Sequence, residues 1–395
     1  MDLKLICLNC RLESDFQVND IFCPRCSQPK QIFPPDLRRV KIHKFADWSL
    51  EKFQEFLPLR EVKSELSLGE GQTPFLRLKK IEPERGLYAK VEASNPTLSF
   101  KDRGSIVVTH KALELGIKQI GTVSTGNMAS STAAYAARAG LQSVLLVKKG
   151  TSPAALISAA VFDPVIIEVD GDYGQLFYHS YEIGEKYGIY FANSVDPLRL
   201  EGYKLTSFEI CLELGRTPDF VYVPVSSGGH LLGLYKGFAE FKLAGLAKSL
   251  PTLIGIQAEG CSPLVRAFKM KYDRVRKAKS VKTIAHSISN PSPPAGDLVL
   301  KLIRENNGYL ISVSDAEMLR AQKLLATQEG LFVQPESAST LAAYFKLRDK
   351  FKGDSVLVLT GQGLKSTAPP LGSRKKIYRT RLENLNTVLD RVSNK

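Results

Sequence analysis

Short runs of apolar and often β-branched residues alternate along most of the chain with longer segments whose apolar residues recur at helical spacing. Strands that are almost continuously apolar and alternate with helices are typical of parallel sheets covered on both faces. The pattern therefore predicts an α/β protein with a doubly wound parallel arrangement. The predicted strands are 86–93, 120–124, 143–149, 164–170, 220–225, 253–259 and 355–360, and the predicted helices are 101–116, 128–140, 152–160 and 173–188.

Length and composition set the broad class. With 395 residues, of which 44% are hydrophobic, the chain can bury a large core, and its length favours two or three domains. No stretch approaches the roughly 18 to 20 uninterrupted apolar residues needed to span a bilayer. The opening MDLKLICLNC becomes polar before a signal-type apolar segment can form. We therefore expect a cytoplasmic protein without a membrane partner.

The net charge of +14 and the pI near 9.4 raise three classes of partner: nucleic acid, an anionic membrane surface and an anionic small substrate. Basic residues are densest at 269–282 and 374–381. These stretches lack the interleaved aromatic residues of a base-stacking surface. We interpret them as solvated faces and expect no nucleic acid partner.

Four of the six cysteines lie in the first 26 residues, as two C-x2-C pairs separated by twelve residues. Each pair can present two thiolates from one tight turn, and two such turns facing each other complete a tetrahedral zinc site. The alternatives are a pair of disulfides or a ribbon that has lost its metal, although cytosolic thiols usually stay reduced. The spacing favours a zinc-ribbon-like segment at 1–30, with zinc bound by Cys7, Cys10, Cys23 and Cys26.

The remaining cysteines, Cys211 and Cys261, stand singly in apolar surroundings and are predicted core residues. After the ribbon, the segment PKQIFPPDLRR (29–39) is interpreted as a linker. Its prolines supply no backbone donor and resist both helix and sheet.

Four polar loops rich in Gly, Ser, Thr or Asn follow predicted strands: 95–104, 124–131, 224–230 and 360–366. In open parallel sheets, ligands bind at the carboxyl ends of the strands. We therefore expect the chemistry of the protein at these loops.

The loop PVSSGGH (224–230) lies between a predicted buried strand and the predicted helix 231–241. Free backbone amides at a helix start, together with the helix dipole, form a site for a phosphate group. A plain turn is the alternative, because glycine-rich strand-to-helix turns are common.

Lys101 lies near a predicted helix start, next to Phe100. Shielding and the positive end of the helix dipole should lower the pKa of its amine, which favours the neutral form that attacks a carbonyl. Pyridoxal phosphate would explain both features, because its aldehyde needs a neutral lysine for a Schiff base and its phosphate needs an amide cradle. A surface lysine at a helix start is the alternative.

From about residue 68 to 366, the chain resembles the threonine synthase family of pyridoxal phosphate enzymes, which have the tryptophan synthase β-type fold. Five motifs carry the resemblance in order: NPTLSFKDRG, STGNMAS, NSVDPLRLEG, PVSSGGH and TGQGLKS. The resemblance implies the type II pyridoxal phosphate fold with two doubly wound domains after the ribbon. The implied large, cofactor-phosphate-binding domain comprises 31–90 and 201–395, and the small domain comprises 91–200.

The resemblance also implies the contacts of the cofactor. Lys101 would form the Schiff base and then move protons at the substrate, and Asn127 would bind the 3-oxygen of the ring. Thr360 would face the pyridine nitrogen and leave it largely unprotonated. The cofactor phosphate would be held by Ser226, Ser227, Gly228, Gly229 and His230.

On the substrate side, Asn193, Ser194 and Arg199 match the family's pocket for the substrate phosphate. An arginine fork suits a dianionic leaving group. Without the resemblance, Asn193 would be interpreted as a turn residue and Arg199 as part of a surface ion pair. The reaction implied is elimination of phosphate from O-phospho-L-homoserine and addition of water at Cβ to give L-threonine, by an enzyme that is usually a homodimer.

The substrate side also departs from the family pattern. Leu98 replaces a glycine, Met128 replaces a threonine beside the substrate, His230 replaces an asparagine, and QPESA (334–338) replaces EPASA. Two alternatives to threonine synthase therefore stay open. One is another elimination enzyme: a β-replacement enzyme on O-phosphoserine that resembles cysteate synthase or a sulfhydrylase, or a threonine or serine dehydratase. The other is a non-catalytic protein that binds pyridoxal phosphate or interacts through its zinc ribbon.

Overall fold

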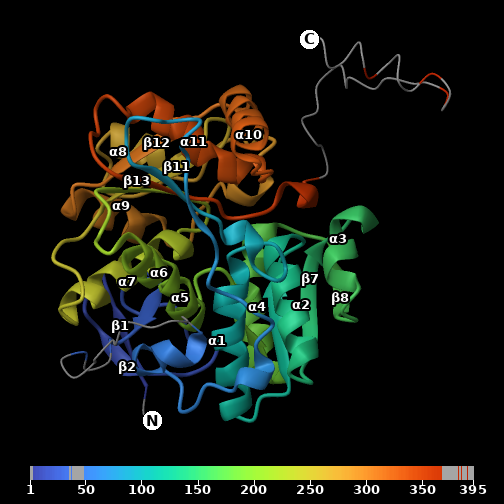
Figure 1. The fold of residues 1–395 in the computed structure, drawn as a ribbon. Coiled ribbons are helices and arrows are strands. Elements are labelled where there is room, and N and C mark those ends of the chain that lie inside the picture. Colours follow the sequence, from blue (N-terminus) through green and yellow to red (C-terminus); the bar gives the residue numbers. More distant parts are fainter. Residues whose placement is uncertain are drawn as a thin grey trace.

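The computed structural model describes residues 3–34, 37, 49–366, 381, 384 and 389. Three sheets organise this part of the chain: a three-stranded antiparallel sheet near the N-terminus, a four-stranded sheet and a six-stranded sheet (Figure 1). The two larger sheets are built mainly from parallel strands joined by helices. The α/β fold predicted from the hydrophobic pattern is therefore confirmed.

The six-stranded sheet has the order β12-β11-β10-β13-β5-β4. All neighbouring strands are parallel except β4, which pairs antiparallel with β5 at one edge. Its strands are β4 (Phe75–Arg77), β5 (Leu87–Lys90), β10 (Phe220–Pro224), β11 (Thr252–Ala258), β12 (Tyr309–Val313) and β13 (Ser355–Val358).

Both faces of this sheet are buried. Along β10, Val221 and Val223 belong to one apolar cluster, whereas Tyr222 between them belongs to another. Along β13, Val356 and Leu357 divide in the same way. Because successive side chains of a strand point to opposite faces, this alternation shows why the strands read as continuous apolar runs. The helix α11 (Pro335–Leu347) covers one face, and α10 (Asp315–Glu329) packs against α11.

The four-stranded sheet has the order β8-β7-β6-β9, and every pair of neighbours is parallel. Helices α2 and α4 pack against it. The bounds are β6 (Gln119–Val123), β7 (Gln142–Lys148), β8 (Val165–Val169), β9 (Ile189–Phe191), α2 (Asn127–Arg138), α3 (Pro153–Ala160) and α4 (Tyr173–Tyr187).

The remaining helices join and cover the two sheets. Helix α1 packs against α2 on one side and α5 on the other, and α5 packs against α7. Their bounds are α1 (Lys101–Glu114), α5 (Pro197–Tyr203), α6 (Leu205–Leu214), α7 (Gly229–Leu243), α8 (Pro263–Lys269) and α9 (Gly296–Glu305).

The N-terminal ribbon consists of β1 (Lys4–Cys7), β2 (Glu13–Asp15) and β3 (Lys30–Ile32), in the order β2-β1-β3. The prediction that 29–39 is a linker is wrong at 30–32, because β3 pairs with β1. This stretch contains no proline, Ile32 is buried, and Lys30 forms an ion pair with Asp20 at 2.7 Å. Residues 35, 36, 38 and 39 of the predicted linker lie outside the described residues.

The other expectations can be placed on this fold. Cys211 and Cys261 are buried, as predicted. The lysines and arginines of 269–282 are exposed, whereas 374–380 of the second basic stretch lies outside the described residues. No helix in the described ranges combines the length and apolar character needed to cross a membrane.

All strands of the four-stranded sheet fall within 91–200, and those of the six-stranded sheet fall before and after it. The exact domain bounds of 1–30, 31–90 with 201–395, and 91–200 stay a prediction.

Candidate active site

Three of the predicted loops follow β5, β13 and β10, which are neighbours in the six-stranded sheet. Because these strands are parallel, their carboxyl ends meet at one edge. The backbone N–H of Phe100 donates to the carbonyl of Thr360 at 3.1 Å, and Ser99 forms a bridge with Gly361. The loops 95–104 and 360–366 are therefore joined by their backbones. The third, 224–230, approaches them through its side chains.

Lys101 begins α1 and lies among aromatic rings. Its Nζ is 4.1 Å from the centroid of Phe100 and 5.4 Å from that of Tyr203. Burial, and then the positive charge of Arg199, lower the pKa of Lys101 to about 7. The predicted direction of this shift is confirmed. An amine with this pKa is substantially neutral near pH 7 and can act as a nucleophile or a base.

His230 joins the phosphate-loop candidate to the lysine. Its ring stacks on Phe100 with a centroid distance of 3.8 Å, and Tyr203 meets both rings edge-on. Burial, followed by the charges of Lys101 and Arg103, lowers the pKa of His230 well below its usual value. Neither ring nitrogen has a hydrogen-bond partner in the described chain. A buried neutral imidazole without a partner can donate a hydrogen bond to a ligand.

The loop before α7 presents a row of free backbone donors. The N–H groups of Ser226 to His230 donate to no acceptor in the part of the chain that the structure describes. Gly228 has φ of +98°, which favours glycine and turns the chain into the helix. The carbonyl of Ser227 is used separately, as it accepts from Ala295 N at 3.0 Å. This loop meets the geometric need of a phosphate group.

Asn127 begins α2, on the four-stranded sheet, and reaches the other motifs through one contact. Its Nδ2 donates to Oε1 of Gln334 at 2.8 Å, and Gln334 N donates to Gly361 O at 2.9 Å. The hydroxyl of Thr360 lies 3.0 Å from that of Ser337. The structure thus brings Asn127 and Thr360 to the same group of loops as Lys101.

Of the predicted substrate residues, Asn193 and Ser194 lie in the connection between β9 and α5, and Arg199 lies in α5. Arg199 is fully buried. Its Nη1 donates to Ser105 Oγ at 2.9 Å, its Nη2 donates to Thr132 Oγ1 at 2.7 Å, and its Nε donates to the carbonyl of Ala192. These acceptors are all neutral, and Arg199 forms no ion pair with a described carboxylate. The interpretation as a surface ion pair is wrong, because the side chain is inside the protein.

Asn193 and Ser194 differ in their contacts with the rest of the protein. Asn193 is buried, with Oδ1 accepting from Val123 N at 2.8 Å and Nδ2 donating to Ser180 Oγ at 2.9 Å. The Ser194 backbone abuts α7, since a Cβ at Gly229 would lie 2.2 Å from its carbonyl oxygen. Ser194 therefore reaches the phosphate-loop candidate, whereas Asn193 already ties β6 to α4.

Met128 is buried in the first turn of α2, directly after Asn127. Its place beside the substrate stays a prediction.

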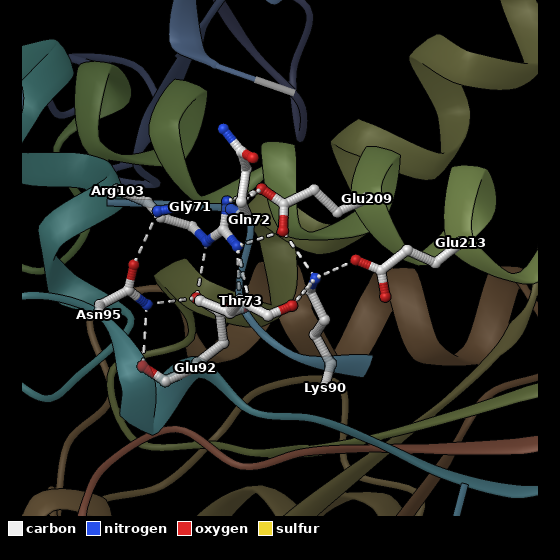
Figure 2. A network of polar contacts seen from close by, with 9 residues as sticks. All are labelled: Gly71, Gln72, Thr73, Lys90, Glu92, Asn95, Arg103, Glu209 and Glu213. Carbon is white, nitrogen blue, oxygen red and sulfur yellow. Dashed lines mark hydrogen bonds and ion pairs between the residues drawn. The ribbon is translucent and has the colours of Figure 1, made fainter. Parts of the chain in front are cut away.

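A buried ion-pair network anchors α1 (Figure 2). The guanidinium of Arg103 donates to both carboxylate oxygens of Glu92 and both of Glu209, at 2.6–2.8 Å. Lys90 forms ion pairs with Glu209 at 2.6 Å and Glu213 at 3.0 Å. Burial alone would raise the pKa of Glu209, but the charges of Arg103 and Lys90 outweigh it and lower the pKa to about 2. The network holds the start of α1, and hence Lys101, against β5 and α6.

Comparison with known proteins identifies the family. Residues 66–361 match the family described as pyridoxal-phosphate dependent enzymes. The chain is 39% identical over 323 residues to the threonine synthase of Methanocaldococcus jannaschii, covering 80% of each chain. The chain belongs to the threonine synthase family of pyridoxal-phosphate dependent enzymes. A threonine synthase of Halalkalibacterium halodurans is 36% identical over 323 residues, covering 80% of this chain and 89% of the relative.

Solved structures show that the family's fold is shared more widely. Maize serine racemase superposes with a TM-score of 0.65 at 18% identity, covering 82% of this chain and 93% of the racemase. The processed form of threonine deaminase isoform 2 from Solanum lycopersicum gives 0.63 at 18% identity, covering 82% of this chain and 84% of the deaminase. At these identities the likeness concerns the fold alone.

The N-terminal cysteines of this family member form one cluster. Their sulfur atoms all lie within 4.8 Å of one another, and the Cys7–Cys26 and Cys10–Cys23 sulfurs are 3.4 Å apart. Tetrahedral zinc thiolates need sulfur separations of about 3.8 Å, given Zn–S bonds of about 2.3 Å. All six cysteines are free thiols. The predicted disulfide alternative is therefore not what the structure contains, and the cluster fits a structural metal site.

Sequence reasoning missed three features of the site. Tyr203 packs near Lys101 although 102 positions (203 minus 101) separate them in the chain. Gln334 was noted only as a departure from the family, yet it is the partner of Asn127. Arg103 and its glutamates gave no local signal, because the partners come from separate elements. Only the adjacency of Arg103 to Lys101 in the KDR triplet pointed there.

Proposed function

We propose that this protein catalyses the threonine synthase reaction, in which O-phospho-L-homoserine and water give L-threonine and phosphate. The observation that carries the proposal is Arg199, a fully buried arginine whose guanidinium donates only to neutral acceptors. Its positive charge lies close enough to Lys101 to lower the pKa of that amine. The buried Asp196 lies near enough for Arg199 to lower its pKa, but Asp196 accepts only from backbone N–H groups and from Tyr190, so no described carboxylate bonds the guanidinium. A buried guanidinium bonded only to neutral groups is costly. A phosphate dianion bound there would offset that cost and would be stabilised as it leaves.

The residues around Lys101 fit pyridoxal phosphate. The free amides of Ser226 to His230 and the unpartnered nitrogens of His230 supply donors for its phosphate. The hydroxyl of Thr360 supplies a neutral partner for its ring nitrogen, and Asn127 a donor for its ring oxygen. When bound, the cofactor supplies a conjugated ring that accepts electrons from the carbon atoms of the amino acid.

The chain's own residues would then divide the work. Lys101, neutral in a large fraction near pH 7, removes a proton from Cα and moves protons at the neighbouring carbons. Arg199 binds the phosphate as the bond between Cγ and oxygen breaks, and water then adds at Cβ. Phe100 and Tyr203 exclude bulk water from the amine and so keep its pKa low.

A β-replacement enzyme that acts on O-phosphoserine is the second candidate. It too would use Arg199, and Met128 in place of the family's threonine is the feature that favours it. The two substrates differ by one methylene, which a pocket discriminates by only about 1–3 kcal/mol. A dehydratase acting on threonine or serine would leave the Arg199 guanidinium bonded only to neutral groups.

The deciding experiment offers the holoenzyme O-phosphohomoserine, O-phosphoserine with sulfite or sulfide, threonine and serine in parallel. We expect phosphate release with O-phosphohomoserine, formation of threonine, and little keto-acid from threonine or serine. Phosphate release from O-phosphoserine alone would establish the second candidate instead. Keto-acid formation without any phosphate release would refute the preference for a phosphorylated substrate.

Arg199→Ala should abolish most of the activity and leave the visible absorbance of the bound cofactor in place. Removing the partner of a desolvated charge costs about 2–5 kcal/mol, which corresponds to a loss of at least about thirtyfold. Arg320→Ala, at an exposed arginine of α10, is the matched control and should keep wild-type activity. Wild-type turnover by Arg199→Ala would exclude Arg199 from the phosphate pocket. Zinc in the cysteine cluster and a homodimer complete the proposal.

A further inference from the structure

The ribbon, residues 3–32, contacts both ends of the segment 189–203. That segment begins with strand β9 and ends with helix α5. It contains Arg199 and the other residues predicted to bind the substrate phosphate. In Figure 1, the ribbon is drawn on the side of the molecule where α5 and α7 lie, and its strand β3 contacts both helices.

Asn19 of the ribbon caps the open edge of the four-stranded sheet. Its Nδ2 donates to the carbonyl of Ile189 at 3.0 Å, and its Oδ1 accepts from the N–H of Phe191 at 2.9 Å. These are the two bonds that one residue of a further parallel strand would make with the edge strand. The side chain of Asn19 thus replaces a neighbouring strand for β9, whose outer backbone groups would otherwise be unpaired.

The local conformation is adapted to this contact. Asn19 is 6% exposed and has φ of 67°, a left-handed conformation that asparagine tolerates better than most residues. Gly184 of α4 makes room, because a Cβ there would lie 2.5 Å from Nδ2 of Asn19. Phe22 packs on Tyr178 and Tyr181 of the same helix, with centroid distances of 5.3 and 5.9 Å.

The ribbon also contacts α5, at the other end of the segment 189–203. Strand β3 packs against α5, which carries Arg199. Ile32 at the end of β3 is buried in the same apolar core, and its carbonyl accepts from Nζ of Lys236 on α7. The segment between β9 and α5 is therefore held from outside at both ends.

Strand β9 is followed directly by a residue that bonds Arg199. The carbonyl of Ala192, next to Phe191, accepts from Nε of Arg199. A shift of β9 would therefore move an acceptor that orients the guanidinium. We propose that Asn19 is a positioning residue for the substrate-phosphate pocket, holding β9 so that Arg199 is oriented toward the phosphate. This inference rests on the proposed function.

The test compares Asn19→Gly with Ser27→Gly in the full-length holoenzyme. Both residues have left-handed backbone and lie in ribbon turns, but Ser27 is exposed and its side chain makes no hydrogen bond in the described chain. Glycine keeps the backbone conformation in both variants. The measurements are KM and kcat for O-phosphohomoserine, binding of inorganic phosphate, zinc content and cofactor absorbance.

For Asn19→Gly we expect KM and the Kd of inorganic phosphate to rise together by about tenfold, which corresponds to roughly one net hydrogen bond. The value of kcat, the cofactor absorbance and the zinc content should match those of Ser27→Gly. Asn19→Asp, which still accepts from Phe191 but turns a charged oxygen toward the Ile189 carbonyl, should shift KM and Kd in the same direction by at least as much. If Asn19→Gly does not fold, Asn19→Asp carries the comparison alone.

Wild-type KM and phosphate affinity in both Asn19 variants would overturn the proposal, as would a loss of kcat and cofactor absorbance without a change in KM. A separate measurement on the wild-type enzyme tests the proposed function itself. A wild-type enzyme that releases no phosphate from O-phosphohomoserine would refute the function. The binding of inorganic phosphate would still report whether Asn19 positions Arg199.

Discussion

Replacing Glu209 by glutamine should destabilise the protein by about 3 kcal/mol at neutral pH. Glu209 is fully buried and accepts from Arg103 through both oxygens, while Lys90 lies 2.6 Å from one of them. Glutamine keeps the shape but removes the negative charge and one acceptor. Breaking a buried ion pair by removing one partner costs about 3–5 kcal/mol, because the cations stay buried without compensation.

The pKa of Glu209 leads to the same magnitude. It lies at about 2 in the folded protein, against an ordinary value of 4.5. A difference of about 2.5 pKa units corresponds to about 3 kcal/mol. Because the folded pKa is depressed, this contribution is fully present above about pH 4.5 and is lost as the pH falls toward about 2. The stability gap between wild type and Glu209→Gln should therefore close across that window.

Urea unfolding followed by circular dichroism at a series of pH values measures the gap. Glu213→Gln is the matched control, since Glu213 is less buried and pairs with Lys90 alone. We expect a much smaller loss for that variant. The reasoning would be refuted by a Glu209→Gln protein within about 1 kcal/mol of wild type near pH 7, or by a gap that does not change with pH.

Two further predictions concern the cofactor and the metal. Borohydride reduction of the holoenzyme should fix the cofactor on Lys101, and a reduced adduct that mass spectrometry finds on another lysine would contradict this. When the cofactor is added to protein without it, the rate at which it attaches to Lys101 should rise with pH through about 7, because only the neutral amine reacts. Protein purified under reducing conditions without chelators should contain one zinc per chain, and chelation should destabilise the ribbon before it affects cofactor absorbance. Metal analysis that finds none would count against a site at Cys7, Cys10, Cys23 and Cys26.

The hydrophobic pattern predicted the sheets well because their strands are buried on both faces. The predicted strand 120–124 corresponds to β6, and the predicted helix 101–116 to α1. Strand β9 was missed, because three residues give too short a run to be recognised by periodicity. Strand β3 was read as linker because prolines flank it.

The candidate site was predictable as far as its residues lie at strand ends. Lys101, Thr360 and the loop 224–230 follow adjacent strands, so the parallel topology brings them together. The contacts of Asn127 with Gln334, and of Arg103 with its glutamates, depend on how helices from different parts of the chain pack. No spacing in the sequence encodes such contacts.

Leu98, which replaces the family's glycine, lies in the turn directly before Lys101, and this turn keeps its backbone conformation. Leu98 keeps φ of 64°, a conformation that costs a side chain about 1–2 kcal/mol and that the family's glycine would adopt freely. The turn is held by its neighbours, since Leu98 N donates to Asn95 O at 2.7 Å and Gln362 N donates to Leu98 O at 3.1 Å. Asp102 accepts from the backbone and hydroxyl of Thr97 across the same turn. The backbone that presents Lys101 is therefore preserved, and the leucine adds a half-exposed apolar side chain at this turn. The substitution alters the surface at this turn and leaves Lys101, the predicted cofactor lysine, in place.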